Sequence, residues 1–562
     1  MKSTQYISNQ LFTTTGTLSA TIQIKMKKIT ILSLAFFLVT IGKTFSQVDK
    51  NPIPVIIEKN DRHALLVDGK PFLILGGQAH NSSGWPAMLP QLWLAVEKLH
   101  ANTLEVPIYW EQIEPQPNKF DFSIVDTLLT QARLHKVHLV LLWFATWKNG
   151  SNHYMPEWMK RDAPKYPNVT GKNGQQIDSP SPHAKATLDA DINAFTAIMK
   201  YLKKADTQHT VIMMQVENES GTWGSVRNYS PLAQKQFEGT VPAELLKPEV
   251  LKALNRPANA SGTWQQVFGD DADEYFHAWS VAKFVGQVAA AGKAIYPLPL
   301  YVNAALRDPL TNPKATNYES GGPTDNVIPI WKAAAPAIDL LAPDIYLSGS
   351  ERVLKVIDLY SRPDNTLFVP EAGLIPDNAK YLYDVIAHGG IGFSPFGIDD
   401  DGQGKKPAEI AEKLAPFAQE YAAAAPMMRE LATWAFEGKI KAVVEHEDQA
   451  KQTIDLGAWQ TVVTFGNRIH GQIKANAQPN GKLMIVQLSD NKFILIGTQC
   501  SVTFKPTGAN TDKAWQYLKV EEGYYKNGVF KALRILNGDE TDWGGPAFGE
   551  QPTVLQVSVV VR

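Results

Sequence analysis

Two segments of the sequence carry acidic side chains directly after an apolar run. The stretch VIMMQVENESG, residues 211–221, leads into Glu217, Asn218 and Glu219, and TLFVPEAG, residues 366–373, leads into Glu371. Cleavage of a glycosidic bond needs paired carboxyl groups, because one acid protonates the leaving oxygen while the other attacks the anomeric carbon or activates water. We therefore expect acids from the two segments to form a pair, with Asn218 placed to hydrogen-bond a substrate hydroxyl.

The elements that must bring these acids together are short buried strands. From about residue 70 to 430, β-rich apolar runs alternate with longer helical patterns, which is typical of βα units. The candidate strands are 71–77, 102–109, 138–144, 211–218, 298–304, 338–346, 366–373 and 390–397. A (β/α)8 TIM barrel closes eight such units and gathers their strand ends at one mouth. An open doubly wound sheet is the alternative, but GGQAHNSS after the first strand lacks its phosphate-loop glycines.

The pattern changes after the barrel. Residues 407–438 are rich in helix-forming residues and are predicted to form the eighth barrel helix and its extension. From about residue 440, β-rich runs such as WQTVVTFG and KLMIVQLS alternate with Asn-Gly turns, which predicts a small C-terminal antiparallel β-sandwich. We divide the chain into an upstream extension with a signal peptide (1–46), a catalytic barrel (47–435) and a β-sandwich domain (436–562).

A targeting signal begins at Met26. Lys27 and Lys28 precede the apolar run ITILSLAFFLVTIG, and small residues before Gln47 resemble a cleavage site. This pattern predicts a secreted or periplasmic protein, and an ordinary N-terminal strand or anchor helix is the alternative. We expect no membrane span, because this run is short for a bilayer and no later stretch is long and apolar enough.

The composition favours an uncharged partner. The 562 residues are 44% hydrophobic and 20% charged with a net charge of −2, which argues against disorder and against a nucleic-acid-binding surface. The chain has 14 Trp, 18 Tyr and 23 Phe, and aromatic faces suit sugar rings. An oligosaccharide or polysaccharide is the expected partner, and the oligomeric state stays open. The single Cys500 lies in an apolar run and is predicted to be a buried strand residue.

Several motifs together resemble a known enzyme family. QVENESG is similar to the Gln-Val/Ile-Glu-Asn-Glu-Tyr-Gly signature of family 35 β-galactosidases, and NTLEVPIYWEQIEPQPNKFDF and FLILGGQAH resemble that family's second-strand and first-strand blocks. The family belongs to a clan of retaining glycoside hydrolases with (β/α)8 barrels. The resemblance implies that Glu219 is the acid/base and Glu371 the nucleophile. Spacing alone would not choose Glu219 over Glu217, because residues two apart share a face of a strand.

The sequence also departs from the family pattern. Gln78 stands where the family commonly has Glu, WFATWKNG replaces a block with an Ala-Glu pair, and Ser220 replaces a Tyr. These differences suggest a divergent bacterial branch. By analogy, a secreted member of such a branch would act on plant-wall galactosides such as xyloglucan side chains.

Further residues are expected at the barrel mouth. The clan often places a Tyr at the end of strand six that hydrogen-bonds the nucleophile and keeps it ionised, and Tyr346 matches it. Tyr109 and Trp110 close strand two, where the family's matching Tyr contacts the sugar. The other expected substrate-binding residues, all at strand ends, are Gln78, Trp147 and Asn303. For His80, also near a strand end, a hydrogen-bonded structural role is favoured.

No metal or cofactor is expected. Asp399, Asp400 and Asp401 lack the alternating spacing of a calcium loop and are predicted to form a solvated turn. His446 has no H-E-x-x-H motif around it, and no G-x-S-x-G elbow is present.

The sequence thus predicts a retaining exo-β-galactosidase that works by double displacement, in which the two carboxyl groups lie about 5–5.5 Å apart. Two alternatives remain open. One is an endo-acting β-glycanase of the same barrel clan, and the other is a non-hydrolytic carbohydrate-binding protein whose C-terminal domain supplies affinity.

Overall fold

The computed structural model describes residues 51–399, 404, 406–469 and 472–562. The signal peptide starting at Met26 lies outside these residues, as do Asp400 and Asp401. Residues 50–562 form one compact unit. Within the described residues, no helix has the length and apolar character needed to cross a membrane.

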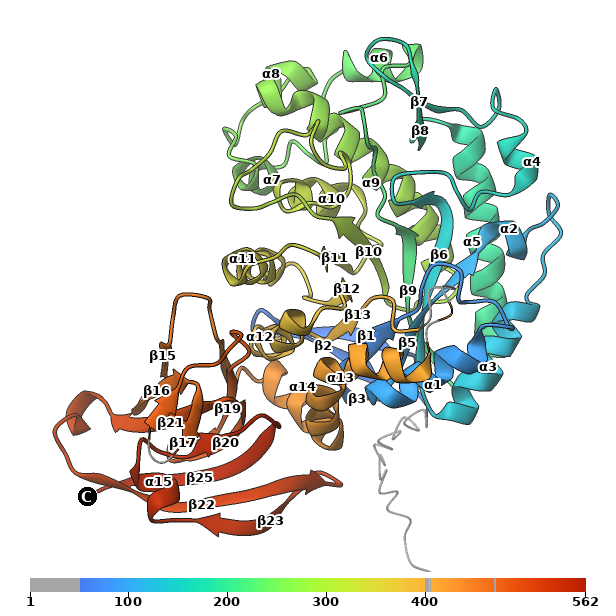
Figure 1. The fold of residues 1–562 in the computed structure, drawn as a ribbon. Coiled ribbons are helices and arrows are strands. Elements are labelled where there is room, and N and C mark those ends of the chain that lie inside the picture. Colours follow the sequence, from blue (N-terminus) through green and yellow to red (C-terminus); the bar gives the residue numbers. More distant parts are fainter. Residues whose placement is uncertain (1–50, 400–403, 405, 470–471) are drawn as a thin grey trace, which may run out of the picture. The chain divides into compact units, whose positions relative to one another are not determined.

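Eight parallel strands close into a barrel in the order β10-β11-β12-β13-β4-β5-β6-β9 (Figure 1). The barrel strands are β4 (Ile74–Gln78), β5 (Thr103–Tyr109), β6 (His138–Lys148), β9 (Val211–Asn218), β10 (Leu300–Ala305), β11 (Leu340–Ile345), β12 (Val369–Ala372) and β13 (Gly392–Pro395). All eight predicted strands are present, so the TIM barrel is confirmed. The ring closes where β13 pairs with β4 through Gly392 beside Ile74 and Phe393 beside Leu75, which rules out the open sheet.

A helix follows each barrel strand and covers the outside of the ring (Figure 1). These helices are α1 (Leu89–Leu99), α3 (Ser123–His135), α5 (Lys185–Ala205), α9 (Ala272–Lys293), α10 (Ile328–Ala334), α11 (Ser350–Tyr360), α12 (Tyr381–Ala387) and α13 (Pro407–Ala424). The predicted extension of the eighth helix is α14 (Met428–Phe436). Apolar residues at helical spacing face the strands, so strands and helices share one large core.

The two long segments predicted after the third and fourth barrel strands carry short elements. The segment after β6 contains α4 (Glu157–Lys160) and the hairpin of β7 (Asn168–Thr170) and β8 (Gln176–Pro180). The segment after β9 contains α6 (Pro231–Phe237), α7 (Pro248–Ala253) and α8 (Trp264–Phe268). Both leave the barrel at the carboxyl ends of strands, which is the face where barrel enzymes carry their active sites.

A three-stranded antiparallel sheet precedes the barrel and was not anticipated from the sequence. It consists of β1 (Val55–Lys59), β2 (Arg62–Val67) and β3 (Lys70–Phe72). The predicted strand at 71–77 is therefore two strands, because β3 pairs with β2 while β4 enters the barrel.

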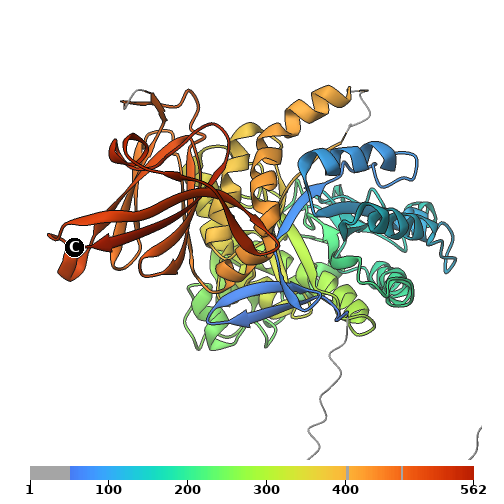
Figure 2. The same cartoon turned by 90° about the horizontal axis from the view of Figure 1, so that it is seen from below.

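Antiparallel sheets form the C-terminal part of the chain, as predicted. There are two main sheets and the two-stranded pair of β17 (Asn467–Ile469) and β18 (Gln472–Lys474). The larger main sheet contains β14 (Ile440–Val444), β19 (Lys482–Ser489), β20 (Lys492–Thr498), β25 (Thr553–Val561), β22 (Trp515–Lys526) and β23 (Val529–Leu536). The smaller contains β15 (Lys451–Asp455), β16 (Trp459–Phe465), β21 (Cys500–Pro506) and β24 (Ala547–Phe548). Apolar side chains of both sheets share one core, and the sheets can be followed in orange and red in Figure 2. Cys500 is fully buried in this core, as predicted.

Tyr421 of α13 ties the last barrel strand to the first. Its buried hydroxyl lies 2.6 Å from the carbonyl oxygen of Phe393 in β13 and 2.9 Å from that of Gly76 in β4. These two strands close the ring, so the hydroxyl reinforces the seam at which the sheet meets itself.

Tyr421→Phe should lower the free energy of unfolding by about 1–2 kcal/mol, because it removes a buried O–H donor that two carbonyl oxygens share. Urea denaturation followed by tryptophan fluorescence measures this loss. Tyr524→Phe is the matched control, since Tyr524 is 44% exposed. Equal unfolding midpoints for the two variants would show that the seam does not depend on this hydroxyl.

Candidate active site

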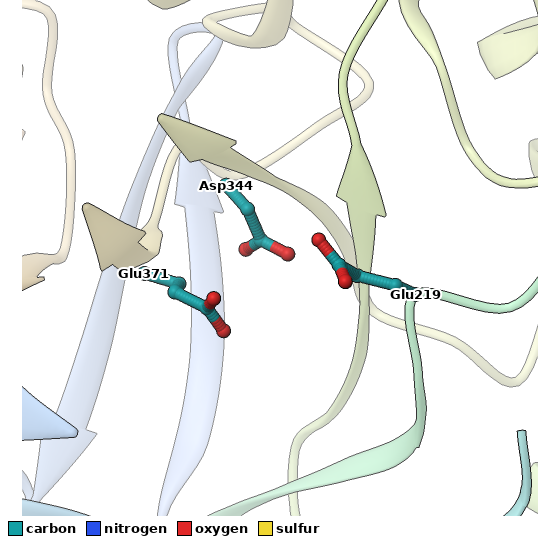
Figure 3. Close-up of side chains that lie close together, drawn as sticks. All are labelled: Glu219, Asp344 and Glu371. Carbon is teal, nitrogen blue, oxygen red and sulfur yellow. The ribbon is translucent and has the colours of Figure 1, made fainter. Parts of the chain in front are cut away.

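Three carboxyl groups meet at the carboxyl ends of the barrel strands. Glu219 follows β9, Asp344 lies in β11 and Glu371 lies in β12, and one carboxyl oxygen of each lies within 4.8 Å of the other two. Figure 3 shows the three groups pointing toward one another. They are only 7%, 2% and 5% exposed, respectively. The structure thus brings together the predicted pair, and it adds Asp344, which the sequence analysis did not select.

The backbone at the end of β9 turns sharply. Glu217 and Glu219 have φ angles of 64° and 42°, in the left-handed region that residues other than glycine rarely adopt. Strained backbone of this kind persists only where the surroundings hold it, and it is frequent at active sites. The turn separates two acids that would share one face of a regular strand.

Glu217 faces away from the carboxyl cluster. Its Oε2 accepts a hydrogen bond of 2.7 Å from the backbone N–H of Trp147, and burial together with the neighbouring Asp191 of α5 raises its pKa well above the usual range. Glu217 therefore supports the junction of β6, β9 and α5. This placement agrees with the choice of Glu219 that the family resemblance implied.

Glu219 is held by three neighbouring groups. Its backbone N–H donates to Oδ1 of Asn303 at 2.9 Å, and its carbonyl accepts from the N–H of Gly150 at 3.0 Å. Its side-chain Oε2 accepts from Nδ2 of Asn149 at 2.5 Å. The carboxyl group is therefore fixed through both its backbone and its side chain.

Glu371 is held by two neutral donors. Nε2 of Gln78 donates to one carboxyl oxygen at 2.8 Å, and the hydroxyl of Tyr346 donates to the other at 2.5 Å. The hydrogen bond predicted for Tyr346 is thus present. Burial and the charge of Glu371 raise the pKa of Tyr346 well above the usual value, so the phenol stays a donor.

Burial and mutual repulsion keep protons in the cluster. Burial, reinforced by the charge of Glu371, raises the pKa of Glu219 to about 7, and Lys148 opposes this rise. Burial and the charges of Glu371 and Glu219 raise the pKa of Asp344 well above its usual range. Near neutral pH the site therefore contains a carboxylic acid ready to give up its proton beside a carboxyl group held by donors.

The predicted residues Asn303 and Asn218 differ in their environments. Both polar atoms of the Asn303 amide are in use, because Oδ1 accepts from Glu219 and Nδ2 donates to Oδ2 of Asp344 at 2.6 Å. Asn303 thus positions two acids, and its expected contact with a substrate hydroxyl stays a prediction. The amide of Asn218 is buried, and neither of its polar atoms has a partner among the described residues.

The aromatic residues expected at the mouth do not all lie there. Trp110 is fully buried with Nε1 donating to Glu114 at 2.8 Å, and Trp147 is fully buried with its ring packed edge-on against Phe284 of α9. Neither indole can offer its face to a sugar, which corrects that expectation. Trp147 thus points from β6 toward an outer helix, and Trp110 begins the short helix α2 (Trp110–Ile113) that follows β5.

Tyr109 and His80 have hydrogen-bonded positions beside the mouth. The Tyr109 hydroxyl accepts from the backbone N–H of Gly84 at 3.0 Å, and its ring stacks near that of Trp85, which is 48% exposed. Nδ1 of His80 lies 3.0 Å from Oδ1 of Asp399, consistent with the structural role favoured for this histidine.

Sequence reasoning missed four polar residues around the cluster. Asp344 stands two residues before Tyr346 in APDIY, so the strand-end rule that selected Tyr346 could also have found it. Lys148 and Asn149 lie where β6 extends beyond its predicted end, and Glu319 comes from a distant loop. No local pattern marks these last three.

The three carboxyl oxygens also have a spacing that could hold a metal ion. Such an ion needs deprotonated ligands. The raised pKa values of Glu219 and Asp344 mean that a metal would have to displace protons from two of the three groups.

Comparison with known proteins gives two family matches. Residues 91–272 match the family model Glyco_hydro_42, described as "Beta-galactosidase". The match covers less than half of the chain. Residues 417–547 match a domain of unknown function, DUF5597. The resemblance to family 35 is not confirmed, since the matching model is that of a different β-galactosidase family.

Individual relatives are distant. A β-galactosidase of Xanthomonas manihotis is 26% identical over 169 residues, which is 29% of this chain and 26% of the relative's length. The β-galactosidase structure from Bacillus circulans sp. alkalophilus has a TM-score of 0.46 at 14% identity and covers 64% of this chain and 57% of its own. That of a catalytic mutant of Gan42B, a GH42 β-galactosidase from G. stearothermophilus, has a TM-score of 0.49 at 10% identity and covers 87% and 99%.

The raised pKa of Glu219 predicts a pH-dependent stability. Because the folded-state pKa of about 7 exceeds the ordinary value of 4.5, the proton stabilises the fold. This contribution is fully present below pH 4.5 and is lost as the pH rises through 7. Glu219→Gln removes the titration, so the unfolding free energy of the variant relative to wild type should rise by on the order of 2 kcal/mol between pH 5 and 8.

Urea midpoints at the two pH values measure this change. Glu97→Gln is the control, because Glu97 is an exposed residue of α1. Parallel pH profiles for wild type and Glu219→Gln would contradict the raised pKa.

Proposed function

We propose that this chain is a retaining exo-β-galactosidase that removes terminal β-galactosyl residues from oligosaccharides or polysaccharides. One observation carries the proposal: carboxyl oxygens of Glu219 and Glu371 lie within 4.8 Å at the barrel mouth. A pKa of about 7 for Glu219 supports its use as an acid near neutral pH. The match of residues 91–272 to a β-galactosidase family supports the choice of sugar.

The proposed reaction proceeds by double displacement. A carboxylate oxygen of Glu371 bonds to the anomeric carbon while the bond to the leaving oxygen breaks, and that oxygen takes the proton of Glu219. Water then attacks the anomeric carbon of the glycosyl-enzyme. Glu219 takes the proton of this water, and the bond to Glu371 breaks, so both carboxyl groups return to their starting states.

The spacing of the acids supports retention over inversion. Retaining enzymes keep their carboxyl groups about 5–5.5 Å apart, whereas inverting enzymes need about 6.5–9.5 Å to admit a water molecule between them. Oxygen atoms within 4.8 Å match the closer arrangement. Direct attack by Glu371 therefore suits the site better than attack by an activated water.

Supporting roles follow from the contacts. Tyr346 and Gln78 donate to Glu371, and hydrogen bonds to a carboxylate favour its ionised, nucleophilic form. We assign Asn218, whose amide has no partner among the described residues, to a hydroxyl beside the anomeric carbon. Tyr109 is itself buried beneath the exposed Trp85, so we assign it to supporting Trp85 at the mouth and not to direct contact with the sugar.

The natural substrate and location are a further part of the proposal. Galactosylated xyloglucan side chains are the first polysaccharide to test, and the apolar run after Met26 would direct the enzyme to the periplasm or outside the cell. A panel of aryl glycosides followed by galactosylated oligosaccharides tests this choice. Release of longer oligomers instead of single galactose units would indicate an endo-acting glycanase.

Glu371→Gln should abolish turnover, with kcat falling at least about 10³-fold because the variant has no nucleophile. Hydrolysis of nitrophenyl β-galactoside measures the loss, and circular dichroism checks that the fold is retained. Glu97→Gln should keep wild-type activity. A near wild-type rate for Glu371→Gln would refute the assignment, and sugar binding without hydrolysis by the wild type would indicate a binding protein.

The anomeric form of the first product should be β, because two displacements at one carbon restore its configuration. Proton NMR during the first minutes of hydrolysis distinguishes β-galactose from α-galactose before the two forms equilibrate. α-Galactose as the first product would exclude the retaining mechanism.

A further inference from the structure

Lys148 is a buried cation beside the acid cluster. It is the last residue of β6 and only 4% exposed, and it pairs in register with Asn218 of β9. Its Nζ lies 5.2 Å from the centre of the Phe144 ring. Among the described residues, no carboxyl oxygen lies within 4.0 Å of this ammonium group, so no direct salt bridge neutralises it.

A hydrogen-bond chain connects this ammonium to Glu219. Nζ of Lys148 donates to Oδ1 of Asn149, and Nδ2 of the same amide donates to Oε2 of Glu219 at 2.5 Å. An amide whose oxygen accepts from a cation becomes a stronger donor at its nitrogen, because hydrogen bonds in a chain polarise one another. The positive charge therefore acts on Glu219 both through space and through the amide.

The backbone fixes the amide in this direction. Asn149 has a φ of 52°, and Gly150 has a φ of 71°. A Cβ atom added to Gly150 would lie 2.8 Å from Oε1 of Glu319, so this position has no space for a side chain. The N–H of Gly150 also binds the carbonyl of Glu219, so residues 148–150 are attached to the acid by two separate hydrogen bonds.

Among the other titratable groups facing Glu219, the charge of Glu371 opposes the lysine and raises the pKa of Glu219 more than Lys148 lowers it. These groups are Asp344 and Tyr346 from β11 and its end, Glu371 from β12, and Glu319 from the loop after β10. Burial raises the pKa of both Glu319 and Asp344 well above their usual ranges, and Tyr346 keeps its proton. Glu319 is only 1% exposed, and its burial is the largest influence on its pKa.

We propose that Lys148 and Asn149 form a cationic relay, two positioning residues that stabilise the carboxylate left on Glu219 when it gives its proton to the leaving group. The inference rests on the proposed function, in which Glu219 is the acid. It deepens that function, because it assigns a role to the segment where WKNG replaces the acidic block expected from family 35. Without the relay, Glu219 is a weaker acid.

Lys148→Met and Asn149→Gly break the relay at its two members. Met keeps the length of the lysine side chain without its charge, and Gly accepts the positive φ of Asn149 while removing the amide. Lys172→Met is the matched control, because Lys172 is an exposed lysine between β7 and β8. Each variant is first checked for wild-type circular dichroism.

The first readout is the pH profile of kcat/KM. Its basic limb, which reports loss of the Glu219 proton, should move up by about 1 pH unit in both relay variants and stay unchanged in Lys172→Met. At pH 7, kcat/KM for methyl β-galactoside should fall by up to about 10-fold, because its leaving group needs the proton and one pKa unit changes the acid strength of Glu219 tenfold. For dinitrophenyl β-galactoside, which leaves without protonation, the change should be less than about threefold.

Two results would overturn the relay. In one, both variants keep the wild-type pH profile and the wild-type ratio of rates on the two substrates. In the other, activity on both substrates falls in parallel with no movement of the basic limb, which would indicate general damage to the structure.

A second readout needs no enzymatic activity. Ionisation of Glu219 lowers the stability of the fold as the pH rises. In Lys148→Met the pH of this loss should rise by about 1 unit, because the pKa of Glu219 is higher without the neighbouring cation. In a Glu219→Gln background the same substitution should cause no such shift. If the wild type hydrolysed no galactoside, the proposed function would fail, but this titration would still test the relay. An equal pH shift caused by Lys148→Met in the wild-type and Glu219→Gln backgrounds would refute the relay.

Discussion

The central constraint in this protein is that several carboxyl groups are buried together where they cannot all be ionised. Asp344 and Glu371 are register partners on neighbouring strands, and Glu219 reaches the same point from β9, so the closed barrel forces like charges into contact. In a medium of low polarity such repulsion is large compared with the stability of a domain. This repulsion is reduced by neutral hydrogen-bond donors to Glu371 and by protons that stay on Glu219 and Asp344. Lys148 is the cation that opposes the remaining negative charge at Glu219.

The geometry of the site is set by regular elements. The acids sit in or directly after barrel strands, and each carboxyl group is held by a side chain from another strand or its extension. An irregular feature is the pair of positive φ angles around Asn218, which turns Glu217 outward and Glu219 inward. That strain is held in place by Asn303, Gly150 and Trp147, so these residues support the acid without being acids themselves.

Much of this architecture could be predicted from the sequence, because the strand and helix periodicities are strong and eight consecutive βα units are typical of a closed barrel. Glu371 follows from its place at a strand end, whereas the choice of Glu219 over Glu217 and the role of Tyr346 came from the family resemblance. The direction of Trp147 could not be predicted, since barrel strands are buried on both faces and show no polar alternation. Lys148 and Asn149 were missed because β6 continues beyond Phe144 through a shift in register, and Glu319 arrives from a loop distant in sequence.

The protons on Glu219 and Asp344 affect how the site would bind a ligand that carries a fixed positive charge. A cationic sugar mimic placed between Glu219, Asp344 and Glu371 would favour three ionised carboxylates, so its binding would release protons to the solvent. The heat measured by calorimetry would then depend on the ionisation enthalpy of the buffer. The affinity of such a ligand would increase toward alkaline pH, in contrast to that of an uncharged sugar.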